Sequence, residues 1–452
     1  MRQRSRGRVT LAAAAAMFAV AALPGQALAA DGAVPYTFDP KASEVSGAEL
    51  NTDAPELRAG SVHKSSIKAG EKLYYRLNLD AKTNAYVSAV VVPEDGGKVA
   101  YGDGVEVSIR SSSDQQCSSR DARFGSAEYP RPIAAYASRL INEDNTSCQD
   151  AGTYYFLVER TSKETSGKGD WDLELRYLSE PQVAKAGSLP TGAPEDWPSA
   201  SPAPPSPAAD NRRHGGTSYY DATSLETGEW RDEIAPGQTL FYRVPVDWGQ
   251  QIFATARMSN TTVPGADTYV SSALAMALDN PAQGHVDSVS PLSYSGKPAS
   301  VSLDPLPPVA YENRFDSDSS VSAMRFAGWY YLSVTLNPEI GKAYGTKPMP
   351  LTLAVKVDGT AGKSPYAGGA GIFGVTQHDK DMARNGQSGP QAAADESSTM
   401  KLVAAAGIGA GTVLVLWLGV WTLIARRRAA AVPSGPVAGA QQYPYGGPPQ
   451  AW

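Results

Sequence analysis

The sequence has few of the residues that most enzymes use for catalysis or metal binding. Its 452 residues include only two cysteines and four histidines, His63, His214, His285 and His378. No histidine lies in H-E-x-x-H or in a zinc-type Cys/His spacing. G-x-S-x-G, P-loop and dinucleotide-binding motifs are also absent. We therefore predict that the protein is not an enzyme and has no catalytic residue, cofactor or metal.

Acidic residues are missing from both ends of the chain, at residues 1–29 and 402–452. Those ends hold seven of the 40 Lys and Arg residues, so the rest of the chain has 33 basic against 46 acidic residues. Phosphate backbones are bound by clustered Lys and Arg. The acidic middle thus argues against nucleic acid as a partner.

Disorder along the whole chain is excluded because 42% of its residues are hydrophobic and only 19% are charged. The 43 Gly and 34 Pro residues predict many turns, but without the period of a collagen. The bias toward Ala, Gly and Pro is typical of actinobacterial proteins.

The N-terminal residues 1–29 are typical of a secretory signal peptide. Four arginines precede an Ala-rich apolar run, and Ala27-Leu28-Ala29 provides small residues for cleavage. An uncleaved membrane anchor is the alternative.

A second apolar run, residues 402–425, carries no charge. As a helix its 24 residues reach about 36 Å, enough to cross a bilayer. Arg426-Arg427-Arg428 follow it and predict a cytoplasmic tail, residues 426–452. We expect a single-pass cell-membrane protein with its N-terminal part outside. Gly407 and Gly411 form a G-x-x-x-G that permits helix dimerisation, although Ala and Gly are simply abundant in this run.

Two further stretches have the composition of connecting segments. Residues 181–216 are rich in Pro, which is typical of an extended linker. Residues 359–401 are rich in Gly, Ala, Ser and Asp and predict a flexible stalk. Two blocks of similar length remain, 40–180 and 217–358, and each is long enough for one hydrophobic core.

The two blocks share an internal repeat. The segment Ile67-Lys68-Ala69-Gly70-Glu71-Lys72-Leu73-Tyr74-Tyr75-Arg76-Leu77 aligns, at an offset of 167, with Ile234-Ala235-Pro236-Gly237-Gln238-Thr239-Leu240-Phe241-Tyr242-Arg243-Val244. Near each block's end, Ala151-Gly152-Thr153-Tyr154-Tyr155 matches Ala327-Gly328-Trp329-Tyr330-Tyr331. We infer that the blocks arose by duplication.

The repeated unit has the pattern of β-structure. Apolar residues stand at every second position in the first block, at Leu73, Tyr75, Leu77 and Leu79. The second block has the same period, at Leu240, Tyr242, Val244 and Val246. Short strands separated by turns predict a mainly β fold. We expect two tandem antiparallel β-sandwiches, jelly-roll-like, followed by one transmembrane helix.

This order of motifs resembles the bacterial pre-peptidase C-terminal domains. The shared pattern is an apolar residue, a turn Gly and alternating L-x-Y-x-L/V, and later A-G-x-Y-Y-x-x-V before a closing strand. The resemblance covers both blocks and implies small secreted β-sandwiches appended to exported enzymes and surface proteins. The acidic central strand usual in that family is weak here, which puts any calcium or polysaccharide role in doubt.

Cys117 and Cys148 are the only cysteines, and both lie in the first block. An even number in an oxidising compartment predicts a disulfide, with two free thiols as the alternative. Asp316 and Asp318 begin like a calcium loop, but Val321 stands where such a loop needs Gly, so we expect a solvated turn.

The aromatic residues Tyr219, Tyr220, Trp230 and Trp248 are candidates for a sugar- or peptide-stacking platform, or for core positions. We expect an extracellular binding or scaffolding module for an envelope protein or cell-wall polymer. A hydrolase or hydrolase-accessory subunit is the alternative, which a pocket with converging Asp, Glu or His would favour. A sensor that dimerises through Gly407 and Gly411 is a third.

Overall fold

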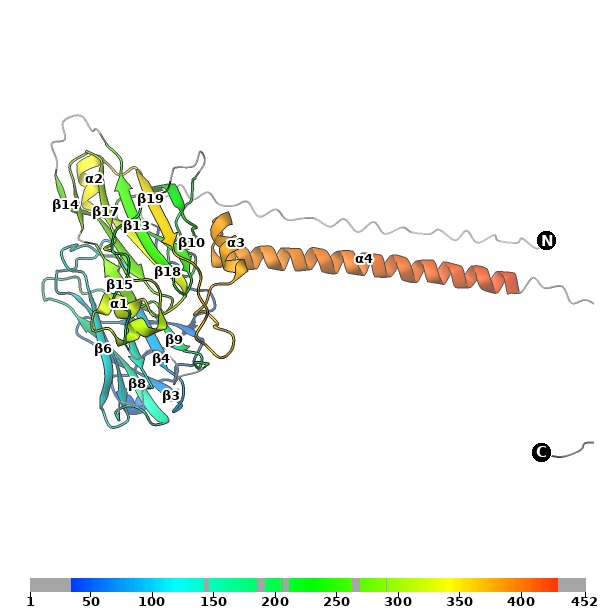
Figure 1. Ribbon diagram of the computed structural model, residues 1–452, viewed down its shortest axis with the longest axis horizontal. Coiled ribbons are helices and arrows are strands. Elements are labelled where there is room, and N and C mark those ends of the chain that lie inside the picture. The colour runs from blue at the N-terminus through cyan, green and yellow to red at the C-terminus, as the bar shows by residue number, and fades with distance from the viewer. Residues whose placement is uncertain are drawn as a thin grey trace, which may run out of the picture.

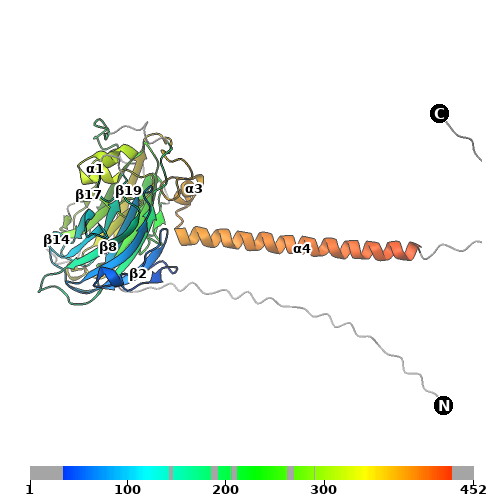
Figure 2. The same cartoon turned by 90° about the horizontal axis from the view of Figure 1, so that it is seen from below.

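The computed structural model is mainly β, as the sequence predicts, with a long C-terminal helix that projects from the β body (Figures 1 and 2). It describes residues 34–141, 146–184, 192–203, 205, 211–261, 269–289 and 291–429, without the side chains of 399, 401–411, 428 and 429. The predicted signal peptide and most of the predicted tail lie outside these residues.

The first block forms a sandwich of two sheets. Its elements are β1 (Ser43–Glu44), the 3₁₀ helix η1 (Asn51–Asp53), β2 (Val62–Ile67), β3 (Lys72–Leu79), β4 (Ala85–Val92), β5 (Gly104–Ser111), β6 (Gln116–Arg123), β7 (Ile133–Arg139), β8 (Gly152–Thr161) and β9 (Trp171–Ser179). One sheet has the order β1-β2-β9-β4-β7 and the other β3-β8-β5-β6. All pairs are antiparallel except the short β1–β2 pair.

The second block repeats this arrangement. Its strands are β10 (Thr223–Ser224), β11 (Gly228–Ile234), β12 (Thr239–Val246), β13 (Gln251–Met258), β14 (Val270–Asp279), β15 (His285–Ser288), β16 (Leu292–Tyr294), β17 (Ala299–Ser302), β18 (Gly328–Leu336) and β19 (Met349–Asp358). Short helices η3 (Tyr311–Phe315), α1 (Ser319–Ala323) and α2 (Glu339–Tyr344) lie between strands. The sheets have the orders β11-β19-β13-β17 and β10-β12-β18-β14-β15, and β16 also pairs with β14.

The two sandwiches have the same topology. In the first, β3 pairs with β8 so that Leu73 lies opposite Val158. In the second, β12 pairs with β18 so that Leu240 lies opposite Val334. In the other sheet of each sandwich, the strand order β2-β9-β4-β7 of the first corresponds to the order β11-β19-β13-β17 of the second. The repeat found in the sequence therefore corresponds to a repeat of strand pairing.

The same turn leads into β3 and β12. Gly70 and Gly237 both have left-handed backbones, with φ of 76° and 82°. The next residue, Glu71 or Gln238, donates its amide hydrogen bond to the carbonyl three residues earlier. Glycine adopts this conformation without a steric cost, which explains its place in both copies of the motif.

The sandwiches pack directly against each other through the outer faces of two sheets. Val90 of β4 and Ala134 of β7 form one buried cluster with Phe241 of β12 and Tyr331 of β18. This differs from two separate modules joined by an extended spacer. Alternation along a strand identifies its two faces, but it does not reveal that another sheet covers the second face.

Residues 359–401 do not form the flexible stalk predicted from composition. Tyr366 and Phe373 are buried, and both belong to the core cluster that includes Tyr86 of the first sandwich. The chain then forms α3 (Gln377–Asn385) and α4 (Gly389–Ala429). The prediction of a flexible stalk was wrong because side chains in this Gly-rich stretch, Tyr366 and Phe373 among them, are buried against the sandwiches.

The proline-rich segment is also held in its described parts. Val183 and Tyr366 form an isolated β-bridge. Gln251 donates a hydrogen bond of 2.8 Å to the carbonyl of Pro198. We call residues 359–376, which run from β19 to α3 past this bridge, the strap.

Among the residues whose side chains are described, no helix is long and apolar enough to cross a membrane. The predicted span, residues 402–425, falls on α4, and its first ten side chains lie outside the description.

Candidate functional site

The most prominent concave region lies where the two sandwiches meet. Residues 124–132, the loop between β6 and β7, extend from the first sandwich onto β14 of the second. Ala127 and Tyr129 pack against Ala275. Ser272 donates a hydrogen bond of 2.9 Å to the carbonyl of Ser126. The loop divides the junction into two cavities.

Arg131 holds this loop in shape. Its guanidinium donates hydrogen bonds of 2.9 Å to the carbonyls of Ala127 and Phe124. It also lies 5.5 Å from the centre of the Phe124 ring and 5.7 Å from that of Tyr129. Burial lowers the pKa of Arg131. These contacts make the loop a fixed wall of the junction.

The first cavity, about 390 Å³, contains a histidine–aspartate pair. His285 Nδ1 lies 3.3 Å from Asp279 Oδ1, and the Tyr219 hydroxyl donates to Asp279 Oδ2 at 2.6 Å. Burial alone would lower the pKa of His285, but its hydrogen bond and charge interaction with Asp279 leave that pKa above the ordinary value. Asp279 therefore favours the protonated form of His285 at the cavity wall.

Hydroxyl groups and charges surround this pair. Ser288, Ser333 and Thr335 also line the cavity. At its rim Arg123 Nε and Asp121 Oδ2 form an ion pair of 2.8 Å. The described residues contain no cluster of three or more metal-ligating side chains. The cavity thus presents hydrogen-bonding groups and balanced charge.

The second cavity, about 660 Å³, lies on the other side of the loop. Its walls include Tyr36 of the N-terminal segment, Lys98 of the first sandwich, and Asn337 and Lys342 of the second. Lys342 forms an ion pair of 2.6 Å with Glu339. Both cavities are lined by residues of both sandwiches.

The predicted aromatic platform is not present. Tyr219, Trp230 and Trp248 are each 5% exposed, and Tyr220 is half-buried. Trp230 lies under the Arg213 guanidinium, whereas Trp248 packs against Tyr366. Their separate environments are core positions, the alternative that the sequence left open. Tyr219 lines the first cavity.

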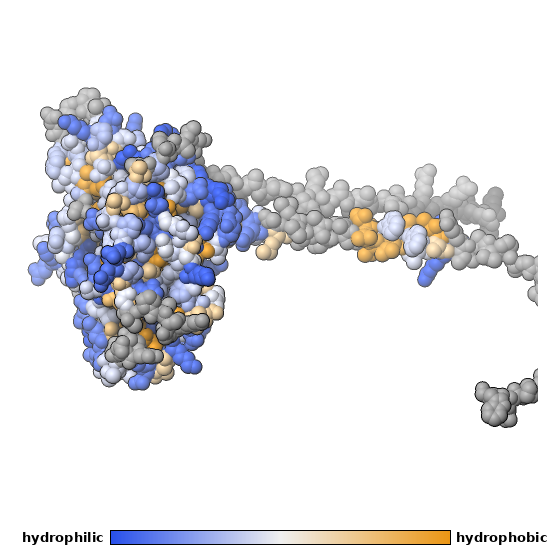
Figure 3. All heavy atoms as spheres, viewed as in Figure 1, coloured by the Kyte–Doolittle hydropathy of each residue, from blue (hydrophilic) through white to orange (hydrophobic). Residues whose placement is uncertain are grey.

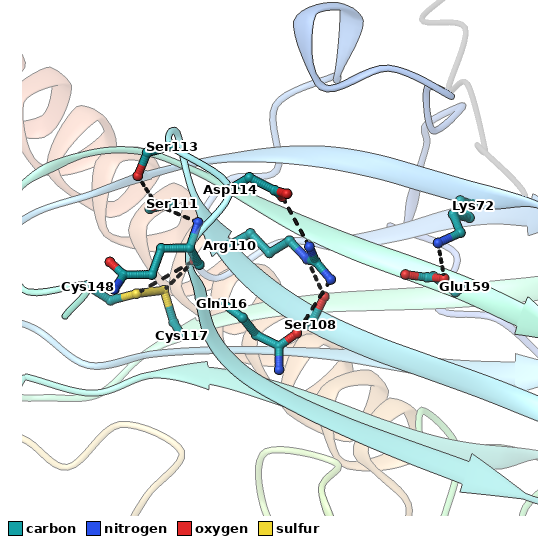
Figure 4. A network of polar contacts seen from close by, with 11 residues as sticks. Lys72, Ser108, Arg110, Ser111, Ser113, Asp114, Gln116, Cys117, Cys148 and Glu159 are labelled. Carbon is teal, nitrogen blue, oxygen red and sulfur yellow. Dashed lines mark hydrogen bonds and ion pairs between the residues drawn. A yellow bond between two sulfur atoms is a disulfide. The ribbon is translucent and has the colours of Figure 1, made fainter.

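The predicted disulfide is confirmed. Cys117 and Cys148 are bonded, with their Cα atoms 5.8 Å apart (Figure 4). The bond joins the start of β6 to the segment that leads into β8. Beside it Arg110 forms an ion pair of 3.1 Å with Asp114. The bond therefore secures one end of the sheet β3-β8-β5-β6.

The other predicted positions have structural surroundings or lie outside the description. Asp318 caps α1 by accepting the amide hydrogen of Ser320 at 2.8 Å, and Asp316 accepts the amide of Asp318 at 2.8 Å. The side-chain surroundings of Gly407 and Gly411 are outside the described residues.

Sequence reasoning missed the pair of Asp279 and His285. The two residues are six apart and lie opposite each other on the hairpin of β14 and β15. The turn residues between them were a usable signal, because a short hairpin places flanking residues side by side.

No family of proteins matches this sequence, and no curated protein matches it. Solved structures with some likeness include a putative secreted protein from Parabacteroides distasonis, at 9% identity and a TM-score of 0.16, covering 68% of this chain and 85% of that one. The tandem CBM22-1–CBM22-2 domains of Paenibacillus barcinonensis Xyn10C have 10% identity, a TM-score of 0.19 and coverages of 67% and 92%. The ANXUR2 extracellular domain from Arabidopsis thaliana has 10% identity, a TM-score of 0.19 and coverages of 72% and 100%. Likeness at this level assigns neither family nor function.

Proposed function

We propose that this chain is an extracellular binding or scaffolding module whose ligand occupies the junction of the two sandwiches. The observation that supports this proposal is that both junction cavities are walled by residues of both sandwiches. Because residues of both sandwiches form the walls of these two cavities, docking of the sandwiches creates the site.

The buried interface favours a preformed cleft. Glu174 and Gln283 connect the sandwiches by a hydrogen bond, and Tyr86 and Tyr366 both donate to Glu180. A site held in its binding conformation loses less entropy on association than a flexible one. The mixed polar lining suits a hydrogen-bonding ligand, either an envelope protein or a cell-wall polymer.

The proposed location is the outer face of a cell membrane. A disulfide is typical of an oxidising compartment. Large apolar side chains along α4, from Val413 to Ile424, are exposed (Figure 3). Such exposure is costly in water, and we propose that lipid covers this part of α4. The resemblance to pre-peptidase C-terminal domains stays a prediction.

The test is capture by the full-length chain from solubilised envelope proteins and from isolated cell wall. Ala277 is half-buried and lines the first cavity. The variant Ala277→Arg places a long side chain there to fill the cavity. Ala81→Arg, at an exposed turn after β3, is the matched control. We expect at least tenfold weaker capture by Ala277→Arg alone. Equal capture by both variants would place the ligand elsewhere.

A hydrolase is the second candidate, and Asp279 with His285 is the observation that favours it. Ser288 and Ser333 line the same cavity, although no hydrogen bond from either serine to His285 is recorded among the described residues. Labelling of the full-length chain by a fluorophosphonate, lost in His285→Asn, would support a serine hydrolase. Absence of labelling would leave binding as the proposal.

A further inference from the structure

A third cavity, about 370 Å³, lies between the strap, α3 and both sandwiches. Arg176 of β9 reaches it from the first sandwich, and Arg243 of β12 from the second. Trp329 lines it beside Arg243, whose guanidinium is 4.2 Å from the centre of the indole. Two arginines from separate sandwiches thus line one space.

Arg243 has fewer partners than its burial requires. It is only 7% exposed, and its Nε donates a hydrogen bond of 2.9 Å to Ser224 Oγ. Burial lowers the pKa of Arg243, and interactions with Tyr331 and Asp379 only partly offset this. Its buried Nη2 has no hydrogen-bond partner among the residues that the structure describes. A buried guanidinium is strongly unfavourable unless an anion or several acceptors compensate for lost hydration.

Another buried arginine shows what compensation looks like in this protein. Arg160 is 3% exposed, and its guanidinium carbon lies 3.7 Å from the centre of the Trp171 ring. Arg243 stacks on Trp329 in a similar way. Arg160 Nη1, however, donates to the carbonyls of Ile67 and Gly169 at 3.0 and 2.8 Å. Within the described part of the chain, no hydrogen bond joins Arg243 to a carbonyl in this way.

The internal repeat provides a comparison for Arg243. Arg76 in β3 occupies the same place in the first sandwich, 167 residues earlier. Its backbone forms a parallel β-bridge with that of Glu56. In the second sandwich the corresponding partner of Arg243 is Ser224. Arg76 forms an ion pair of 3.5 Å with Glu56. The two copies therefore share the arginine, but the second has serine where the first has the carboxylate of Glu56.

Asp379, a carboxylate that lines this cavity, interacts with the charge of Arg243 but is held by other hydrogen bonds. Asp379 Oδ1 accepts from Trp329 Nε1 at 2.9 Å. Its Oδ2 accepts from the backbone and the hydroxyl of Thr376, at 2.8 and 2.6 Å. Among the described residues no ion pair joins Asp379 to Arg176 or Arg243. Its oxygens instead cap the start of α3.

We propose that this cavity binds a phosphodiester group between Arg176 and Arg243. Two guanidinium groups and the carboxylate of Asp379 leave a formal charge of +1 around the cavity, which matches the single negative charge of a phosphodiester. Guanidinium groups are suited to phosphate oxygens because they donate in parallel pairs. The N-terminus of the nine-residue helix α3 at this cavity adds a favourable dipole.

Two sources can supply this chemistry, a lipid headgroup or a phosphate-containing wall polymer. The cavity adjoins the base of α4, because a Cβ added to Gly389 would lie 3.4 Å from Arg243 Nη1. At about 1.5 Å per residue, residue 402 lies about 20 Å further along the helix. If α4 enters a bilayer as proposed above, the cavity lies on the headgroup side of the membrane, within about 20 Å of the hydrocarbon core along the helix.

The test is calorimetric titration of the full-length chain, in neutral detergent, with glycerophosphoglycerol. Arg176→Gln removes a half-buried guanidinium for which the structure records no hydrogen bond or ion pair among the described residues. Arg243→Gln removes the buried one, and Arg76→Gln is the matched control in the first sandwich. We expect saturable binding by the wild-type chain and by Arg76→Gln. Arg176→Gln should bind at least tenfold more weakly, and Arg243→Gln should not bind.

Two outcomes overturn the proposal: no saturable binding by the wild-type chain, or equal affinity in Arg176→Gln and wild type. Thermal melting of each variant identifies loss of folding, and Arg176→Gln keeps the test decisive if Arg243→Gln fails to fold. Capture of a junction ligand by Arg176→Gln should stay at the wild-type level, so the two proposals fail independently.

Nanodiscs distinguish the two sources. If a headgroup fills the cavity, phosphatidylglycerol in the disc will block the soluble diester, whereas discs of phosphatidylcholine alone will not block it as strongly. Unchanged binding in both discs indicates a polymer source. Either result supports a phosphodiester site, because the soluble diester binds in both cases before competition.

Discussion

Gln283 of the second sandwich donates from Nε2 to Glu174 Oε1 of the first, at 3.4 Å. The other oxygen of Glu174 accepts from the Tyr36 hydroxyl at 3.3 Å, and Ser88 donates to Gln283 at 3.0 Å. Glu174 is 3% exposed, and burial raises its pKa to about 7. A titratable carboxyl group therefore lies inside the interface that creates the junction cavities.

This burial predicts a pH-dependent stability. The folded protein binds the Glu174 proton more tightly than the unfolded chain, whose carboxyl has its ordinary pKa of about 4.5. The free energy of unfolding should thus fall as pH rises from about 4.5 to 7, by up to about 3 kcal/mol, and level off above 7. Urea unfolding from pH 5 to 8 measures this slope.

Glu174→Gln imitates the protonated carboxyl and should remove this contribution, so that the variant is more stable than wild type at pH 8. Glu164→Gln, at an exposed position, should leave the slope unchanged. A Glu174→Gln variant with the wild-type slope would contradict the assignment of the titration to Glu174.

The strap should contribute strongly to docking of the sandwiches. Phe373 is 1% exposed, and its ring stacks on that of Phe326 with 4.6 Å between the ring centres. The ring centre of Tyr86, in the first sandwich, is 6.3 Å from that of Phe373. Phe373→Ala should cost about 3–5 kcal/mol. Hydrogen exchange should then increase at the interface, around Glu180.

The neighbouring Ile372 is 37% exposed and provides the control. Ile372→Ala should cost much less than Phe373→Ala. If the two variants have equal stability and equal exchange, the strap does not hold the sandwiches together.

Removal of the disulfide should destabilise the first sandwich. Cys117 and Cys148 are 31 residues apart, and closure of a loop of this length stabilises by roughly 3–4 kcal/mol in the chain-entropy model. Cys117→Ser with Cys148→Ser should lower the melting temperature. The described chain has no free cysteine, so a reductant should shift the wild type to the same temperature and leave the double variant unchanged. A reductant effect on the double variant would point to another cause.

The duplicated turn should respond equally in its two copies. Gly70→Ala and Gly237→Ala each place a side chain at a left-handed backbone, at a cost of about 1–2 kcal/mol. Gly102 has no such backbone, and an added Cβ there would meet only Lys163 at 3.9 Å. Gly102→Ala should therefore be nearly neutral. Denaturant unfolding of the three variants checks this, and a neutral Gly237→Ala would show that the turns are not equivalent.

Short-range patterns in the sequence determined the strands and their repeat. Leu73 and Tyr75 alternate with polar residues and are buried as predicted, and Gly70 and Gly237 mark the same turn. The cysteines also pair as expected. These features depend on near neighbours in the chain or on the only possible partner, which explains why the sequence was sufficient.

Only the tertiary structure decided what covers the outer faces of the sheets. Phe241 and Tyr331 are buried because the first sandwich packs on them, and Phe373 crosses to the interface from a Gly-rich segment. Arg243 faces a cavity because residues of β9 and α3 come together there. Strand periodicity assigns side chains to faces, whereas contacts between distant faces depend on the shape and charge of the whole chain.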